Sequence, residues 1–246
     1  MFMEIDARLK QKLSAYSPSS QALEPIRAAP LVFLVGITGA GKNTTLDRLL
    51  HKYPDQYHFI VSHTTRAPRE NHGIMEQDGV QYHFVTPETI EKMLDNSEFI
   101  EAMPVHSSIY GSSIKEVADA HAQHKIAITD LDIQGVEHYM GLGLNAKPIF
   151  MLPPNYDIWY QRFIARYGGK VHHHDLVVRL QSAVKEIEHA LASDYFYIVI
   201  NDDLDKAVEL VNDIAHSGPV DPHYPKAVDI AEELLTRIRQ ELEKML

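Results

Sequence analysis

The feature that most constrains the fold is an uninterrupted apolar run, LVFLVG at 31–36, which a glycine-rich loop follows at once. A run without polar alternation is typical of a strand buried on both faces of a parallel sheet. Further candidates for such strands are IAITDLDI at 126–133, PIFML at 148–152 and YIVIN at 197–201. These runs predict a largely parallel sheet.

Helical patterns separate the runs. Helices are expected in NTTLDRLLHKY after the loop and at about 113–123, 154–167, 176–192 and 203–215. TPETIEKML also reads as a helix, because Thr86 followed by Glu88 and Glu91 resembles a capping box. HFIVSH and YHFV are predicted as two further strands. Strands that alternate with helices predict an α/β fold, a sheet core flanked by helices.

Two appendages flank the predicted domain at 31–215. Residues 1–30 form an arm: an amphipathic helix at 1–16, with Phe2, Ile5, Leu9 and Leu13 at helical spacing, then an irregular linker, SPSSQALEPIRAAP. Residues 216–246 form a proline-rich linker and a helix with Ile230, Leu234, Ile238 and Leu242 one turn apart. These helices are expected either to pair between subunits, in a homo-oligomer, or to cover the core.

Composition excludes several classes of protein. The net charge of −11 argues against a general binder of nucleic acid or anionic membranes. No apolar run approaches the roughly 18 residues of a membrane span. The absence of cysteine excludes disulfides and thiolate metal sites and fits a cytoplasmic protein. Any anionic ligand must therefore be held by a few local cations.

The loop GITGAGKNTT at 36–45 has the glycines and lysine of a phosphate-binding loop between a strand and a helix. Its backbone N–H groups and the helix N-terminus would bind nucleotide phosphates, and Lys42 would reach the β- and γ-phosphates. The alternative is a glycine-rich turn with a solvated lysine. The expected nucleotide-binding residues are Gly36, Thr38, Gly39, Ala40, Gly41, Lys42, Asn43 and Thr44.

Asn43 occupies the position at which such loops normally carry the Ser or Thr that ligates Mg²⁺. An amide oxygen is a hard but neutral ligand, so Asn43 is a weak metal candidate or only a polar residue at a helix start. Asp130 and Asp132 end an apolar strand, where α/β folds place ligand chemistry. Asp130 is expected to hold Mg²⁺ through water, and Asp132 to order arginines or the base, unless both are helix caps.

Arg66 and Arg69 stand three residues apart in a Ser/Thr-rich segment, VSHTTRAPRENHG. In an acidic protein, this pair suggests a planar, bidentate phosphate clamp. The alternative is a pair of surface arginines that face the nearby Glu70.

Several ordered motifs make the chain resemble guanylate kinase from about residue 31 to 215: SHTTRAPR, GVQYHFV, EFIEAMPVHSSIYGSS, TDLDIQG and NDDLDKA. The resemblance implies a core, a small mixed GMP-binding subdomain at about 62–112 and a helical lid at about 160–182. It also implies that four residues hold the GMP phosphate: Ser62, Arg66, Arg69 and Tyr82. Glu101 and Ser112 would read guanine, and Tyr110 would line the site, with Asp130 and Asp132 beside it.

Guanine chemistry agrees with the role that the resemblance gives to Glu101. Guanine presents N1–H and an exocyclic amine side by side, and one carboxylate accepts from both. Adenine lacks this donor pair and would leave the carboxylate unsatisfied. The alternative is a solvated glutamate on a strand.

The resemblance further implies three lid arginines, Arg162, Arg166 and Arg179, which would neutralise charge on the transferring phosphoryl group with Lys42. Asn201 matches a contact of the ATP adenine. Within the lid, YGGKVHHHDL departs from the family pattern. His172, His173 and His174 are adjacent on one loop, so they are expected to be exposed rather than to bind a metal.

The sequence therefore predicts an enzyme that uses ATP and Mg²⁺ to phosphorylate GMP, with Asn43 and the altered lid slowing it or weakening its Mg²⁺ affinity. One alternative is a guanylate-kinase-like module that binds without turnover. The other is a kinase of a different small phosphorylated substrate, which Tyr82, Glu101 and Ser112 disfavour.

Overall fold

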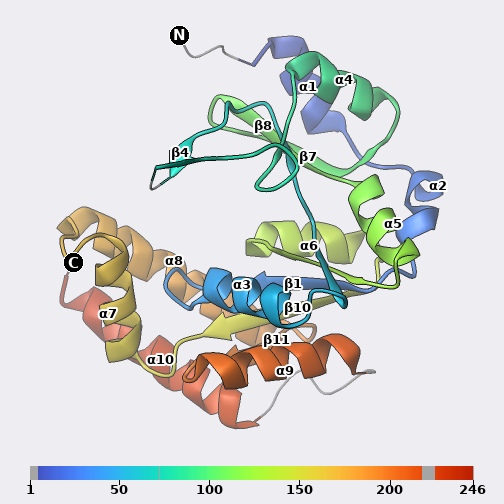
Figure 1. Cartoon of the computed structure of the whole chain (residues 1–246). Helices are drawn as coiled ribbons and strands as arrows, with labels where there is room; N and C mark the ends of the chain where they lie inside the picture. Colours follow the sequence, from blue (N-terminus) through green and yellow to red (C-terminus); the bar gives the residue numbers. More distant parts are fainter. Residues whose placement is uncertain (1–4, 72, 218–224, 246) are drawn as a thin grey trace. The chain divides into compact units, whose positions relative to one another are not determined.

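The computed structural model describes residues 5–71, 73–217 and 225–245. These form two compact units (Figure 1). The described parts of 1–29, 58–127 and 143–145 make up the first unit, and those of 30–57, 128–142 and 146–246 make up the second.

The second unit is built on a five-stranded sheet with the order β11-β10-β1-β9-β2. Its strands are β1 (Leu31–Val35), β2 (Tyr57–Phe59), β9 (Ile126–Asp130), β10 (Ala146–Leu152) and β11 (Tyr197–Ile200). Strands β10 and β1 run parallel from Leu31↔Ala146 to Val35↔Phe150, and β11 runs parallel to β10. All five residues of β1 are buried, which confirms the parallel core predicted from the apolar runs.

Helices pack around this sheet: α3 (Lys42–Lys52), α6 (Ile133–Gly141), α7 (Tyr156–Arg166), α8 (His173–Ala192), α9 (Leu204–His216) and α10 (Pro225–Glu243). Helix α3 contacts β1 and α9, and α6 contacts β10. The C-terminal helix α10 lies along α8 and also contacts α7 and β11 (Figure 1). Leu234 and Ile238 are buried there, so the apolar stripe of α10 covers its own unit.

The first unit holds a mixed four-stranded sheet, β6-β3-β8-β7, and a β4–β5 hairpin. Strand β3 (His63–Thr64) is parallel to β6 (His83–Phe84) and antiparallel to β8 (Ser108–Ser113), which pairs antiparallel with β7 (Phe99–Val105). The hairpin joins β4 (Glu70–Asn71) to β5 (Ile74–Met75). The unit's helices are α1 (Ala7–Ala15), α2 (Ser20–Leu23), the 3₁₀ helix η1 (Glu24–Ile26), α4 (Pro87–Asp95) and α5 (Ile114–Ala122).

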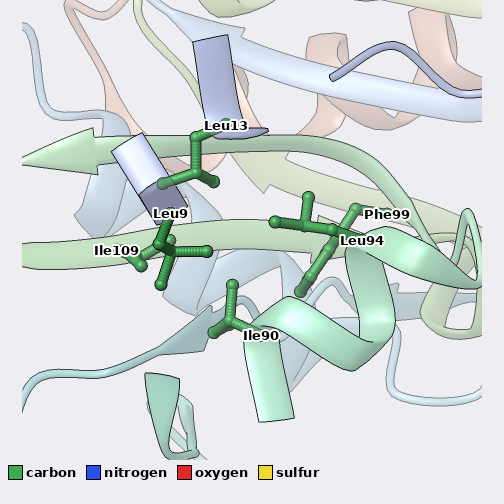
Figure 2. Packing of buried hydrophobic residues seen from close by; sticks show 6 residues of the cluster. All are labelled: Leu9, Leu13, Ile90, Leu94, Phe99 and Ile109. Atoms are coloured by element: carbon green, nitrogen blue, oxygen red, sulfur yellow. The ribbon is translucent and has the colours of Figure 1, made fainter. Parts of the chain in front are cut away.

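One face of this mixed sheet is covered by α1 and α4. Figure 2 shows six buried side chains that meet there: Leu9 and Leu13 from α1, Ile90 and Leu94 from α4, and Phe99 and Ile109 from the β7–β8 hairpin. The N-terminal amphipathic stripe thus has an intramolecular partner, as in the covering alternative. Phe2, which the sequence places on the same stripe, lies outside the described residues.

Two local predictions are wrong. HFIVSH is not one strand: it contributes β2 to one sheet and β3 to the other, and between them the Val61 N–H donates to the Glu116 carboxylate at 3.3 Å. The segment 17–30 is not wholly irregular, because it contains α2 and η1. Ser19 caps α2 by accepting from the Ala22 N–H, and Leu23 and Ile26 are buried. Short apolar pairs stabilise helical turns there, despite the flanking prolines.

Within the described residues, no helix is long and apolar enough to cross a membrane.

Candidate functional site

The glycine-rich loop lies between β1 and α3 and adopts backbone conformations that glycine alone accepts readily. Gly36, Gly39 and Gly41 have φ values of +134°, +88° and +93°. A Cβ atom at Gly36 would meet the Met151 carbonyl oxygen at 2.2 Å, and one at Gly41 would meet Asn201 Nδ2 at 2.2 Å. The loop thus turns in contact with β10 and with the end of β11, which is why larger residues do not fit.

Lys42 is the first residue of α3 and folds back over the loop. Its ammonium group donates to the carbonyl oxygens of Gly36 and, at 3.4 Å, Ile37. Burial lowers the pKa of Lys42; the carboxylates of Glu186 and Asp130 oppose that shift, and the Arg166 charge adds to it. The lysine is therefore held inside the turn, at the positive end of a helix.

Three side chains from distant segments hold the loop. Trp159 of α7 donates from Nε1 to the Thr38 carbonyl at 2.8 Å. Asn201, buried after β11, donates from Nδ2 to the Ala40 carbonyl at 2.9 Å. Arg162 donates to the Asn201 carbonyl at 3.0 Å, so one chain of bonds runs from α7 to the loop.

A cavity of about 650 Å³ opens at this loop. It brings together predicted residues from three segments: the loop and α3 start, α7 and the end of β11. It is lined by Gly39, Gly41, Lys42, Asn43, Thr44, Arg162, Arg166, Asn201, Asp202 and Leu204. Arg179 lies in the second turn of α8 with an exposed side chain, so it is not brought to these residues in the way that Arg162 and Arg166 are.

The oxygen donors near the loop fit a Mg²⁺ ion that a nucleotide brings with it. Asn43 and Asp202 line the cavity, and Asp130 is close enough to Lys42 to act on its charge. In the part of the chain that the structure describes, no three His, Cys, Asp or Glu side chains form a metal cage. Mg²⁺ usually keeps several waters and binds one or two protein oxygens plus phosphates, so such a cage is not needed.

The connection between α7 and α8 is a tight turn. Gly168 and Gly169 adopt φ values of +66° and +83°, which glycine accepts more readily than other residues. His172 caps α8 without a side-chain hydrogen bond, and His173 and His174 are its first residues. All three imidazoles are exposed, as predicted.

In the first unit, three predicted guanine-site residues share one face of the β7–β8 hairpin. Glu101 pairs across the strands with Ser112, and Tyr110 stands two residues from Ser112 on β8. Ser112 is buried; its hydroxyl donates to the Glu101 carboxylate at 3.5 Å and lies 3.5 Å from the Ser62 hydroxyl. This is the face opposite the apolar cluster of α1 and α4.

Arg66 is engaged by Glu76, and not by Glu70 as the alternative prediction had it. Its Nη1 and Nη2 donate to the two Glu76 oxygens at 2.8 and 3.0 Å, and its Nε donates to the Tyr110 hydroxyl at 3.1 Å. The guanidinium lies 5.1 Å from the centre of the Tyr82 ring. The hydrogen bond to Glu76 raises the pKa of Arg66 and lowers that of Glu76.

The partner of Arg66 in the predicted clamp, Arg69, has an exposed side chain, and its backbone N–H donates to Glu76 at 2.8 Å. Glu76 therefore ties both arginine positions of the loop together. Arg66 and Arg69 also line a second cavity, of about 580 Å³, with Ile5 and Leu9 of the N-terminal segment.

Asp132 is the N-cap of α6: its carboxylate accepts from the Gly135 N–H at 2.8 Å. The helix-cap alternative for this residue is therefore correct, although a cap does not exclude a further contact. Asp130 is different, because it is exposed at the carboxyl end of β9 and acts electrostatically on Lys42.

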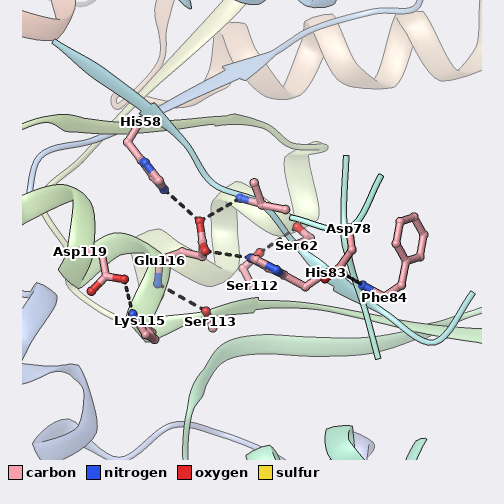
Figure 3. Close-up of polar contacts among 11 residues, drawn as sticks. His58, Ser62, Asp78, His83, Phe84, Ser112, Ser113, Lys115, Glu116 and Asp119 are labelled. Atoms are coloured by element: carbon pink, nitrogen blue, oxygen red, sulfur yellow. Dashed lines mark hydrogen bonds and ion pairs between the residues drawn. The ribbon is translucent and has the colours of Figure 1, made fainter. Parts of the chain in front are cut away.

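A carboxylate at the start of α5 joins several strands near the guanine-site residues. Figure 3 shows Glu116 accepting hydrogen bonds from the Nε2 atoms of His58 and His83, both at 2.9 Å. Burial raises the pKa of Glu116, but these two bonds and the Val61 N–H outweigh burial and lower it to about 2. The backbone N–H of His83 donates to the Ser62 carbonyl at 2.9 Å. Glu116 thus links α5 to β2, β6 and the Ser62 backbone.

Sequence reasoning missed three residues that hold the site: Trp159, Glu76 and Glu116. Trp159 is the chain's one tryptophan and stands in a predicted lid helix, which was a usable signal. Glu76 and Glu116 carry no such signal, because the partners through which they act are 7 to 58 residues away.

Comparisons with known proteins agree on one family. The family model described as guanylate kinase matches residues 28–217. A guanylate kinase of Schizosaccharomyces pombe is 34% identical over 202 residues, which cover 82% of this chain and 96% of the relative. Guanylate kinase 1 of Oryza sativa subsp. japonica is 35% identical over 179 residues, 72% of this chain and 45% of that longer relative.

A solved structure agrees with these sequence matches. The crystal structure of guanylate kinase from Anaplasma phagocytophilum superposes with a TM-score of 0.53 at 25% identity. The match covers 77% of this chain and 85% of that chain. The parallel core and the mixed sheet described above therefore have a counterpart in a known fold.

Proposed function

The chain belongs to the guanylate kinase family, and on that premise we propose that it transfers the γ-phosphoryl group of ATP to GMP, forming ADP and GDP. The observation that carries the proposal is the loop at 36–42. Its positive-φ glycines turn the backbone around Lys42, and it opens on a cavity lined by two arginines. A module that bound GMP alone, through the residues of the first unit, would not need this second cationic site.

The chemistry at the loop is charge neutralisation. Phosphoryl transfer spreads negative charge over the oxygens of the transferring group, and no covalent intermediate on the protein is required. Lys42, Arg162 and Arg166 line one cavity, and we assign them to neutralise that negative charge. Arg179, on α8, is assigned a supporting role from the lid. Asn201 supports ATP binding by holding the Ala40 carbonyl and thus the loop itself.

We propose Mg²⁺ as the metal ion that the reaction requires. When bound, it would supply positive charge that offsets the charge of the nucleotide phosphates. Among the residues of this chain, the Asn43 amide oxygen and Asp130, through water, are assigned to hold it. The amide oxygen of Asn43 is neutral and fits the tight octahedral shell of Mg²⁺ less well than the usual hydroxyl at this position. Weak Mg²⁺ affinity is therefore expected.

Guanine recognition is assigned to Glu101 and Ser112. The Glu101 carboxylate would accept from N1–H and the exocyclic amine of guanine, with Ser112 orienting the carboxylate from the opposite strand. Ser62, Arg66, Arg69 and Tyr82 are assigned to the GMP phosphate. The bidentate Glu76 contact fixes the plane of the Arg66 guanidinium before the ligand arrives.

The proposal is tested by measuring ADP formation from ATP and Mg²⁺ with GMP, AMP, CMP and UMP offered separately. Turnover with GMP only, lost in Lys42→Ala, is the expected result. Absence of turnover with all four, while GMP still binds in calorimetry, would refute the kinase and leave the binding module. Equal turnover with a non-guanine acceptor would refute the role of Glu101.

A further inference from the structure

The N-terminal helix ends in a tyrosine whose hydroxyl bonds the backbone of β7. Tyr16 is the C-cap residue of α1. Its hydroxyl donates to the Phe99 carbonyl oxygen at 2.6 Å and accepts from the Phe99 N–H at 3.2 Å. One side chain thus satisfies both backbone groups of a residue that is 83 positions away.

These two backbone groups are at an edge of the sheet. Strand β7 is the last in the order β6-β3-β8-β7, so no further strand pairs with its outer side among the described residues. Buried backbone groups that lack a hydrogen-bond partner destabilise the fold. The Tyr16 hydroxyl takes the place that a neighbouring strand would otherwise fill.

Phe99 is also where the β7–β8 register shifts. Phe99 pairs with Ser113 and Glu101 pairs with Ser112, so Ile100 is an extra residue in β7, a β-bulge. Both Phe99 and Ile100 are buried, so the bulge lies in the packed part of the strand. A shift of one residue would move the Glu101 side chain to the opposite face, away from Ser112.

The Phe99 side chain is packed within the sheet. The Phe99 ring lies over Gly111, where an added Cβ would meet it at 2.8 Å, and meets the His63 ring edge-on at 5.6 Å between centroids. Helix α1 itself is fastened elsewhere: Lys12 bonds Glu91 at 3.0 Å and Asp95 at 2.6 Å on α4. The Tyr16 hydroxyl reaches the bulge from this helix through its two hydrogen bonds to Phe99.

We propose that Tyr16 is a positioning residue for guanine recognition, which fixes the Phe99–Ile100 bulge and thereby directs the Glu101 carboxylate. This inference rests on the proposed function, because it concerns the same base-reading carboxylate. Residues 1–27, which include Tyr16, lie outside the segment that the family model matches. The hydroxyl acts two residues from Glu101 and does not touch the substrate.

The experiment compares full-length wild type with Tyr16→Phe, which keeps the ring and removes the hydroxyl. Rates are measured against GMP and against IMP, which lacks the exocyclic amine that Glu101 would read. We expect the KM for GMP to rise about five- to tenfold and the GMP-to-IMP ratio of kcat/KM to fall by a similar factor, with the KM for ATP unchanged.

Lys12→Met is the matched control, because it loosens the same helix without touching β7. It should retain the wild-type GMP-to-IMP ratio. The inference is overturned if Tyr16→Phe keeps that ratio, if it lowers both rates equally, or if Lys12→Met reproduces its effect. Thermal melting establishes that each variant is folded.

Calorimetric titration with GMP separates the two hypotheses. Wild type that binds GMP without turnover would refute the kinase proposal, and weaker GMP binding in Tyr16→Phe would still support the positioning role. Wild type that neither binds nor phosphorylates GMP would overturn both. Unchanged binding in Tyr16→Phe, beside an active wild type, would overturn the positioning role alone.

Discussion

Replacing Glu116 with glutamine should destabilise the first unit and reshape its response to acid. The carboxylate accepts three hydrogen bonds, from His58, His83 and the Val61 N–H, which tie α5 to two strands (Figure 3). Glutamine has one acceptor oxygen and turns an NH₂ group toward one of these donors. At least one of the three bonds is therefore lost or reversed.

The magnitude follows from the pKa of Glu116. An ordinary glutamate has a pKa of 4.5, and that of Glu116 is lowered to about 2. The difference corresponds to about 3 kcal/mol of stability at neutral pH that depends on the ionised form. Because glutamine retains one acceptor, we expect Glu116→Gln to lower the free energy of unfolding by about 2 kcal/mol at pH 7.

The pKa of Glu116 is lower in the folded state than in the unfolded state, and this sets the sign of the pH dependence of stability. The stability from Glu116 is fully present above about pH 4.5 and is lost as the pH falls toward 2. The gap between wild type and Glu116→Gln should therefore be widest at neutral pH and close in that window. Both proteins should also weaken between pH 6.5 and 4, because burial lowers the pKa of His63 to about 4.

Urea unfolding at pH 7, 5 and 3, followed by circular dichroism, measures this gap. Lys115→Met is the control on the same helix, since the Lys115–Asp119 pair is exposed and its loss should change the free energy of unfolding little. A gap below about 0.5 kcal/mol at pH 7, or one that persists at pH 3 undiminished, would refute the account of Glu116 as an ionised bridge.

Three further changes test the site. Asn43→Ser places a hydroxyl ligand at the loop and should lower the Mg²⁺ concentration for half-maximal rate severalfold. A normal Mg²⁺ dependence in wild type, with no gain in the variant, would defeat that reasoning. Trp159→Phe removes the donor to the Thr38 carbonyl, so it should lower the free energy of unfolding in urea by about 1–3 kcal/mol and raise the KM for ATP. An unchanged KM would show that the loop does not need this bond. Glu76→Gln leaves Arg66 poorly paired, so we expect a lower midpoint of urea unfolding and a raised KM for GMP. Wild-type values for both would contradict the preorganised clamp.

Local sequence patterns predicted much of the fold. The apolar run at 31–35 became β1, the glycines after it became a positive-φ loop, and the helix at 204–216 begins where Asp203 caps it. These features depend on residues within a few positions of one another, so periodicity, glycine placement and capping residues predict them. Motifs in order along the chain also identified the family that the comparisons show.

Only the tertiary structure decided which side chains support the site. The sequence offered Glu70 as a partner for Arg66, but the hairpin of β4 and β5 brings Glu76 there. The Tyr16 hydroxyl meets Phe99 across 83 positions, and Glu116 meets His58 across 58. No local propensity encodes such pairs, because they form only when topology and register bring distant segments together. The chemistry of the loop could therefore be predicted from its own residues. The side chains that position the loop and the proposed guanine-binding carboxylate could be identified only in the folded chain.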